Sequence, residues 1–205
     1  MRYRVPLLAV SIAASLALCA CSGGSSAPKP SPTPSSPSVT VASPSPSPAR
    51  TGPLTTGPGV HPGEKPPELS HFEREHTSAG ARSFAAYYFK AFDWSIATND
   101  PYLVAEISAS NCQACRRVVN EIHDLKTKAE TLRGGRIRVL GLKLVTGSFR
   151  IHSDYAIEVR TTQGAEILSA RSAAPSTVPA AGNDQSVVFV SWLNGGWKIV
   201  EVGAP

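Results

Sequence analysis

The chain has 205 residues, and its composition changes along its length. Residues 22–67 hold 13 of the 18 prolines, which leaves residues 68–205 to bury a core, enough for one compact domain. This division excludes a multidomain enzyme, a solenoid, a coiled coil and a multi-span membrane protein. The formal net charge of +5 does not indicate a nucleic-acid binder, because residues 68–205 carry 15 Lys and Arg against 14 Asp and Glu.

The N-terminal residues are typical of an export signal. A short basic region, Met1–Arg4, precedes the apolar stretch 5–20, which is too short for a convincing permanent membrane span. The stretch ends in Leu-Cys-Ala-Cys-Ser, which resembles the bacterial lipobox with Cys21 as the modified residue, whereas Cys19 follows a bulky leucine and does not fit. The resemblance implies cleavage before Cys21, acylation with chains such as palmitate, and a protein held on the outer face of the cytoplasmic membrane. The alternative is an ordinary secreted protein with a chance cysteine.

Residues 21–67 are expected to form the lipidated cysteine and a disordered tether. Their Pro-Ser repeats cannot bury enough apolar surface to offset chain entropy, and they favour extended polyproline II at roughly 3 Å per residue. Such a tether would hold a domain away from the membrane, towards cell-wall polymer. The Ser, Thr and Pro content also suits O-glycosylation, with an unmodified spacer as the alternative.

Three helices are expected at the start of the domain. Aromatic and small residues at three- to four-residue spacing predict a helix over 78–98, and Asn-Asp-Pro ends it and starts a short helix over 101–107. The third helix, about 111–133, has a continuous apolar face that includes Cys112 and Cys115, and Gly134-Gly135 follows it.

The rest of the chain is expected to form strands. Residues 136–146 are rich in strand formers but their alternation slips at Gly141, which predicts a bulge. Further strands are expected over 155–159, 165–169, 187–193 and 197–202, and Asn194-Gly195-Gly196 predicts a hairpin between the last two. Residues 170–184 are expected to be a long loop. This order predicts an α+β domain over 68–205, with helices on one face of a bent antiparallel sheet.

The order of elements resembles the cone-shaped fold of nuclear transport factor two and ketosteroid isomerase. The lipobox, the Pro/Ser tether, the aromatic helix, the Cys112-x-x-Cys115 helix start and the final Trp-Lys-Ile-Val strand together resemble a family of uncharacterised lipoproteins of high-GC Gram-positive bacteria. The resemblance implies a location and a fold, and it brings no activity.

Cys112 and Cys115 have four interpretations. A structural disulfide is favoured, because these are the only thiols left after export in an oxidising compartment and both lie on the apolar helix face. A redox-active pair would suit a helix N-terminus but lacks the preceding strand of thioredoxin-like proteins. A metal site would need His123 or His152 at an unfamiliar spacing, and two free buried thiols are the fourth alternative.

Several side chains are candidates for a pocket in the cone mouth. The aromatic candidates are Tyr87, Tyr88, Trp94, Tyr155 and Trp192, although filling the helix–sheet interface is the simpler role for such residues. The acid–base types available are Asp93, Asp100, Asp154 and His152. Asp93 is expected on the solvated helix surface and Asp100 in a turn, and none of the four belongs to a recognisable catalytic motif.

The sequence therefore favours a non-enzymatic ligand- or partner-binding domain, without cofactor or metal, whose partner is an envelope protein, a cell-wall polymer or a small molecule. One alternative is a cone-fold enzyme or carrier for a small hydrophobic or sugar-like molecule. The other is a thiol–disulfide partner acting through Cys112 and Cys115, which requires at least one exposed sulfur.

Overall fold

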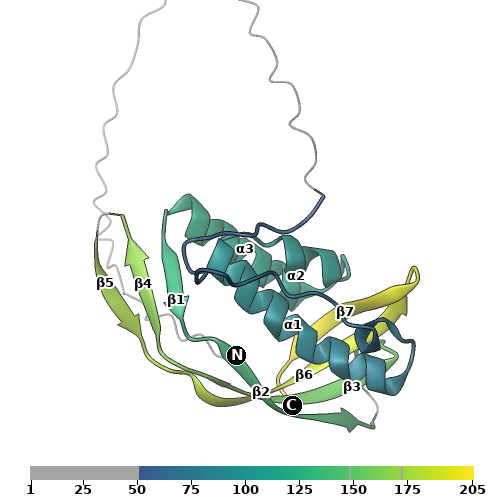
Figure 1. Cartoon of the computed structure of the whole chain (residues 1–205). Helices are drawn as coiled ribbons and strands as arrows, with labels where there is room; N and C mark the ends of the chain where they lie inside the picture. Colours follow the sequence, from purple (N-terminus) through teal and green to yellow (C-terminus); the bar gives the residue numbers. More distant parts are fainter. Residues whose placement is uncertain (1–50, 148, 172) are drawn as a thin grey trace, which may run out of the picture. The chain divides into compact units, whose positions relative to one another are not determined.

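The computed structural model describes residues 51–147, 149–171 and 173–205. The expected signal peptide, Cys21 and the tether as far as residue 50 lie outside the described residues. Residues 51–205 belong to one compact unit (Figure 1). In this described part of the chain, no helix is long and apolar enough to cross a membrane.

The helices come first in the chain. A short 3-10 helix, η1 (Phe72–Arg74), precedes α1 (Ser78–Thr98), α2 (Tyr102–Ile107) and α3 (Gln113–Thr127). The Thr77 hydroxyl caps α1 by accepting a hydrogen bond from the backbone N–H of Gly80 at 3.0 Å. Asn99 ends α1 in the left-handed conformation, with φ 50°. The predicted bounds of the first two helices are thus confirmed to within a residue.

The third helix is shorter than the sequence predicts. Lys128 caps α3, and residues expected in its last turn instead form β1 (Thr131–Gly134). The apolar spacing continues beyond the helix, but β1 pairs with β4 (Glu166–Ala170), and this tertiary pairing determines the local structure.

The remaining strands are β2 (Ile137–Val145), β3 (Tyr155–Gln163), β5 (Ala173–Val178), β6 (Gly182–Leu193) and β7 (Gly196–Gly203). They form two antiparallel groups, in the orders β1-β4-β5 and β2-β3-β6-β7. The register shift between Val139 and Gly141 confirms the predicted bulge. The expected loop over 170–184 was wrong, because β5 forms there by pairing with β4.

The two groups are successive arms of one bent sheet. Three long strands cross from one arm to the other, and each is interrupted at the same level, at 135–136, 164–165 and 179–181. Gly135 (φ 59°) lies at the first interruption, where a Cβ atom would stand 2.0 Å from the Glu166 side chain. Glycine at this position therefore permits the bend (Figure 1).

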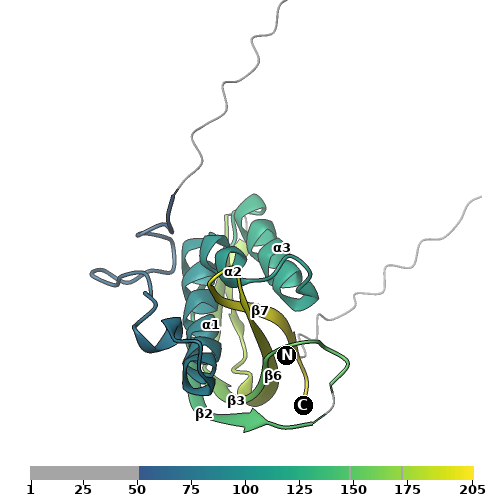
Figure 2. The same cartoon turned by 90° about the vertical axis from the view of Figure 1, so that its right-hand side faces the viewer.

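Helix α1 packs on the sheet, with α2 and α3 beside it (Figure 2). The interface is filled by large side chains that are almost completely buried, among them Phe84, Tyr88, Phe89, Ile157 and Ile199. This arrangement confirms the predicted α+β class with helices on a bent antiparallel sheet.

Residues 54–75 form a strap that runs antiparallel to α1. Near the C-terminal end of α1, the indole N–H of Trp94 donates to the Leu54 carbonyl at 2.9 Å, and the Gly59 N–H donates to the Ala97 carbonyl at 2.8 Å. Further along, the Tyr87 hydroxyl donates to the Pro67 carbonyl at 3.2 Å. The part of the expected tether after residue 50 is therefore packed on the domain.

Candidate functional site

A surface hollow of about 720 Å³ lies where the strap, the first half of α1 and the β6–β7 hairpin meet. Its size is within the range of ligand pockets in proteins. It is lined by Glu68, Leu69, Glu73, Arg74, Phe84, Tyr87, Glu106, Ile107, Trp192, Leu193, Asn194, Gly195, Gly196, Trp197 and Lys198. We refer to it below as the hairpin hollow.

Aromatic rings form one side of the hairpin hollow. Phe84, Tyr87 and Trp197 are buried beneath it, and Trp192 is half-buried. The rings of Trp192 and Trp197 meet edge to face, with centroids 5.1 Å apart. His76 stacks on Trp192 with centroids 4.6 Å apart and planes 13° apart. These contacts hold the Trp192 ring in one orientation.

The position of Trp192 also depends on the two-residue turn beside it. Asn194 and Gly195 have φ values of 53° and 83°, as a hairpin turn with two left-handed residues requires. The Asp154 carboxylate accepts a hydrogen bond from the Trp192 backbone N–H at 2.8 Å. The hairpin predicted from Asn-Gly-Gly is thus confirmed, and it places a tryptophan at the edge of the hollow.

The charged groups of the hairpin hollow are of both signs. The Glu73 carboxylate accepts from the Ser70 backbone N–H at 2.8 Å and from the Ser70 hydroxyl. The Arg74 guanidinium donates to the Leu69 carbonyl at 3.1 Å. The Lys198 ammonium donates to a backbone carbonyl, that of Glu106. These three side chains thus serve local structure as well as the lining.

The pKa of Tyr87 depends on its burial and on the charged groups of the hollow. Burial raises the pKa of its phenol to about 12, with further increases from the Glu106 and Glu73 carboxylates and an opposing effect of Arg74. The phenol is therefore neutral at physiological pH, and it acts as a hydrogen-bond donor to the strap.

The five aromatic pocket candidates do not come together. Tyr87 and Trp192 line the hairpin hollow, whereas Tyr88 and Trp94 lie in the core and do not reach it. Tyr155 contacts the edge of Trp197 at 5.7 Å between centroids and borders a different hollow. The helical spacing correctly predicted that Tyr87, Tyr88 and Trp94 lie on one helix. It could not show which of them lines the hollow. The charged lining residues gave no sequence signal, because isolated Glu and Lys are ordinary surface residues.

The second hollow, of about 610 Å³, is lined by residues 144–147, 149 and 151–156. It is thus formed by the connection between β2 and β3 with the adjoining strand ends. Phe149 from this connection packs edge to face on Phe189, with centroids 5.2 Å apart. The connection covers a small apolar cluster that includes Phe189, Val187 and Ala156.

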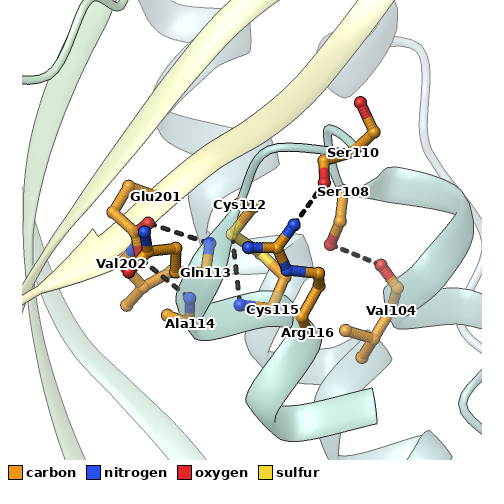
Figure 3. Close-up of a disulfide and its surroundings, with 10 residues drawn as sticks. All are labelled: Val104, Ser108, Ser110, Cys112, Gln113, Ala114, Cys115, Arg116, Glu201 and Val202. Atoms are coloured by element: carbon orange, nitrogen blue, oxygen red, sulfur yellow. Dashed lines mark hydrogen bonds between the residues drawn. A yellow bond between two sulfur atoms is a disulfide. The ribbon is translucent and has the colours of Figure 1, made fainter.

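Cys112 and Cys115 form a disulfide at the start of α3 (Figure 3). Both residues are buried, at 0% and 1% exposure. The Cys112 sulfur accepts a hydrogen bond from the Cys115 backbone N–H at 3.1 Å, so the disulfide also caps the helix. The thiol–disulfide hypothesis required an exposed sulfur, and this requirement is not met.

None of the four acid–base candidates lines the hairpin hollow; Asp154 and His152 line the second hollow, and Asp154 accepts from the Trp192 backbone N–H. Asp93 faces the sheet rather than solvent, so its expected surface position was wrong. Its carboxylate accepts from the Ile137 N–H at 2.9 Å, and burial raises its pKa to about 7, against the opposing effects of that hydrogen bond and of Arg136. Asp100 accepts from the Leu54 N–H at 3.3 Å, and His152 is exposed.

Within residues 51–147, 149–171 and 173–205, no three His, Cys, Asp or Glu side chains are grouped so that they could hold a metal ion. His123, one of the two histidines proposed to complete a cysteine site, is exposed on α3, and both sulfurs of that site are joined in the disulfide.

Helices packed on a bent antiparallel sheet place this domain in the α+β class. More closely, the chain belongs to a family of unknown function (DUF6318), whose model matches residues 65–203. No curated protein matches the chain.

Two solved structures show limited likeness to the chain. The intermembrane space region of the chloroplast protein ARC6 aligns with a TM-score of 0.42 and 15% identity, covering 64% of this chain and 99% of that one. A protein from Xanthomonas campestris, described as a calcium/calmodulin-dependent protein kinase II association domain, aligns with a TM-score of 0.31 and 11% identity, covering 68% and 94%.

Proposed function

We propose that this protein is an envelope lipoprotein whose domain is a non-catalytic binding module, and that the hairpin hollow is its ligand site. The observation that carries the proposal is the hollow itself. It combines a ligand-sized volume with a fixed tryptophan at its edge and polar groups of both signs around it.

The position of the hollow along α1 suits a tethered module. The strap joins the domain beside Trp94 and Asp100, near the C-terminal end of α1. The hollow lies beside Phe84 and Tyr87, in the N-terminal half. Ten helical residues separate Trp94 from Phe84, which is about 15 Å at 1.5 Å per residue. The ligand site is therefore away from the point where the tether meets the domain.

Anchoring through Cys21 is the part of the proposal that rests on sequence. Two or three acyl chains give lasting membrane attachment, whereas one is marginal. We expect Cys21→Ser to move the full chain from the membrane fraction to the soluble or secreted fraction and to abolish labelling with a palmitate analogue. Cys19→Ser is the matched control and should leave both unchanged. Equal labelling of the wild type and Cys21→Ser would contradict the anchor.

The alternative of catalysis or carriage uses the same hollow and depends on its acids. Glu73 is the buried carboxylate there, and it already accepts hydrogen bonds from the backbone N–H and the hydroxyl of Ser70. This engagement favours a structural role for Glu73 and so supports binding rather than acid–base chemistry. Turnover of any bound molecule that Glu73→Gln abolishes, while binding persists, would favour the enzyme instead.

Ligand binding is tested by thermal unfolding of the full chain against envelope lipids, glycans and small hydrophobic metabolites. A ligand at 100 times its Kd adds about 2.7 kcal/mol of stability, which is easily detected. We expect Trp192→Ala to abolish the stabilisation and Phe149→Ala, in the second hollow, to retain it. The reverse pattern would place binding in the second hollow and contradict the proposal.

A further inference from the structure

We infer that the hairpin hollow takes an uncharged saccharide chain and that Trp192 is the surface on which a sugar ring stacks. This inference rests on the proposed function, because it names the ligand class of the same site. Three properties of the lining support it: its charge balance, its exposed hydrogen-bonding groups and its fixed aromatic surface.

The charge balance disfavours an ionic ligand. Three carboxylates and two basic side chains line the hollow, so an anion and a cation would each meet groups of their own sign. The two basic groups, Arg74 and Lys198, already donate to backbone carbonyls of the protein. A hydroxyl-bearing neutral molecule has no net charge to be repelled by either set.

The rim of the hollow offers hydrogen-bonding groups suited to hydroxyls. Glu68 and Glu106 present exposed carboxylates that accept, and the Asn194 amide both donates and accepts. A sugar hydroxyl also donates and accepts, so it can pair with each of these groups. A purely apolar ligand would instead remove them from water without replacing their hydrogen bonds, which is costly.

Trp192 supplies the apolar surface that orients such a ligand. Its ring is held by His76 on one side and by the Trp197 edge-to-face contact, and it borders the hollow. A ring fixed before binding loses little entropy on contact. The faces of a pyranose ring that carry C–H groups are flat and apolar. A rigid indole can therefore cover one such face while the hydroxyls of the sugar reach the polar rim.

The exposed rim favours a chain over an enclosed single sugar. Leu193 is 40% exposed, and Asn194, Gly195 and Glu68 beside it are exposed as well. Residues on either side of a bound unit can therefore extend into solvent. An oligosaccharide longer than the hollow should bind at least as well as its monosaccharide.

The test is titration of the full chain, in a detergent without a sugar head group, with four separate probes. The probes are the N-acetylglucosamine tetramer, maltotetraose, laurate and spermidine, with tryptophan fluorescence and thermal unfolding as readouts. We expect one or both tetrasaccharides to bind, the corresponding monosaccharide to bind more weakly, and Trp192→Ala to reduce affinity at least tenfold. Phe72→Ala is the matched control, because that ring is 63% exposed and outside the lining, and it should not change affinity.

The outcomes separate the ligand class from the site. Binding of laurate or spermidine alone, lost in Trp192→Ala, would overturn the saccharide inference and leave the proposed function standing. Saccharide binding that Trp192→Ala does not weaken would overturn both for this hollow. A protein that is folded by thermal unfolding and binds none of the four probes would overturn the saccharide inference, whereas the proposed function is decided by the wider panel of lipids, glycans and metabolites.

Discussion

The indole N–H of Trp197 donates to the backbone carbonyl of Glu75 at 2.9 Å, across 122 residues of sequence. This bond ties the last strand to the end of the strap. Because Trp197 forms the base of the hairpin hollow and Glu75 directly follows η1, the bond fixes two walls of the hollow relative to each other.

Trp197→Phe keeps an aromatic ring but loses the indole N–H donor and part of the ring volume. We expect a loss of at least about 1 kcal/mol in the free energy of unfolding, since the Glu75 carbonyl is left without its partner and the smaller buried ring leaves a cavity. Trp94→Phe is the control, because it loses the equivalent bond to Leu54 at the other end of the strap. Denaturant unfolding should show similar losses for both variants, while only Trp197→Phe shifts the Trp192 indole N–H signal in a ¹H–¹⁵N spectrum. An identical position of the Trp192 signal in the two variants would contradict a link between this bond and the hollow.

The strap is close-packed on α1 at Gly57. A Cβ at this position would lie 2.3 Å from the Thr98 Cα atom, so Gly57→Ala must displace the backbone and should cost about 1–3 kcal/mol. A Cβ at Gly52 would meet nothing within 4 Å, and Gly52→Ala should be close to neutral. Chemical denaturation of the two variants checks this, and equal stabilities would show that residues 51–67 are not part of the folded unit.

The disulfide should stabilise the domain modestly, because it closes a very short loop. Replacing both cysteines by alanine should cost about 2 kcal/mol by the loop-entropy relation. Cys112→Ser combined with Cys115→Ala should recover about 1 kcal/mol of this loss. The serine hydroxyl can accept the hydrogen bond that the backbone N–H of residue 115 now donates to the Cys112 sulfur. Thermal unfolding of both double variants is the measurement. Equal stability of the two would mean that the sulfur cap contributes nothing.

The side chain of Glu201, on β7, also caps the N-terminus of α3. Its carboxylate accepts from the Gln113 N–H at 3.0 Å and from the Ala114 N–H at 2.9 Å, at the positive end of the helix dipole (Figure 3). We expect Glu201→Ala to cost about 1–2 kcal/mol and Glu201→Gln to cost less, because one acceptor oxygen remains. Hydrogen exchange should show faster opening of the first turn of α3 in Glu201→Ala. Unchanged protection there would contradict the capping role.

Asp93 should make stability depend on pH. Its pKa is raised from 3.8 to about 7 in the fold, so between these values the folded state holds a proton that the unfolded state has released. The stabilisation from the protonated form is complete below pH 3.8 and is lost as the pH rises to 7. Asp93→Asn stays neutral and keeps an oxygen for the Ile137 N–H, so it should be more stable than the wild type at pH 8, by about 1 kcal/mol or more, and not at pH 4.

The control for this pH dependence is Asp124→Asn, on the exposed face of α3. Its stability difference from the wild type should stay nearly constant from pH 4 to 8. If the difference between Asp93→Asn and the wild type is equally constant, the raised pKa of Asp93 is wrong.

Local sequence signals predicted the elements that depend on local physics. The Asn-Asp-Pro turn correctly predicted the end of α1, where Asn99 is left-handed, and Asn194-Gly195 forms the hairpin because both turn positions need a positive φ. The bulge before Gly141 followed from the slip in alternation, which is also a local property. The disulfide was favoured because these are the only thiols left after export and both lie on the apolar face of the expected helix.

Features that depend on distant pairing were not predicted. Strands β1 and β5 form because β4 lies between them. The sequence of β1 by itself predicts the end of a helix, and the sequence of β5 by itself predicts a loop. The packing of Gly57 and Gly59 on α1 depends on the absence of side chains, which a Pro- and Gly-rich segment also shows in a free tether. Asp93 is surrounded by residues from the strap and the bend of the sheet, so its burial could not be inferred from its helix alone.

The most direct test of the hairpin hollow as the ligand site uses the indole N–H signals of the three tryptophans in a ¹H–¹⁵N spectrum. Trp94 and Trp197 donate their indole N–H to the backbone carbonyls of Leu54 and Glu75, and Trp192 borders the hollow. On titration with the N-acetylglucosamine tetramer or maltotetraose, we expect the Trp192 signal to move in a saturable way while the Trp94 signal stays fixed. Saturable movement of the Trp94 signal with Trp192 unchanged, or no movement of any of the three with either sugar, would contradict a saccharide site in the hollow.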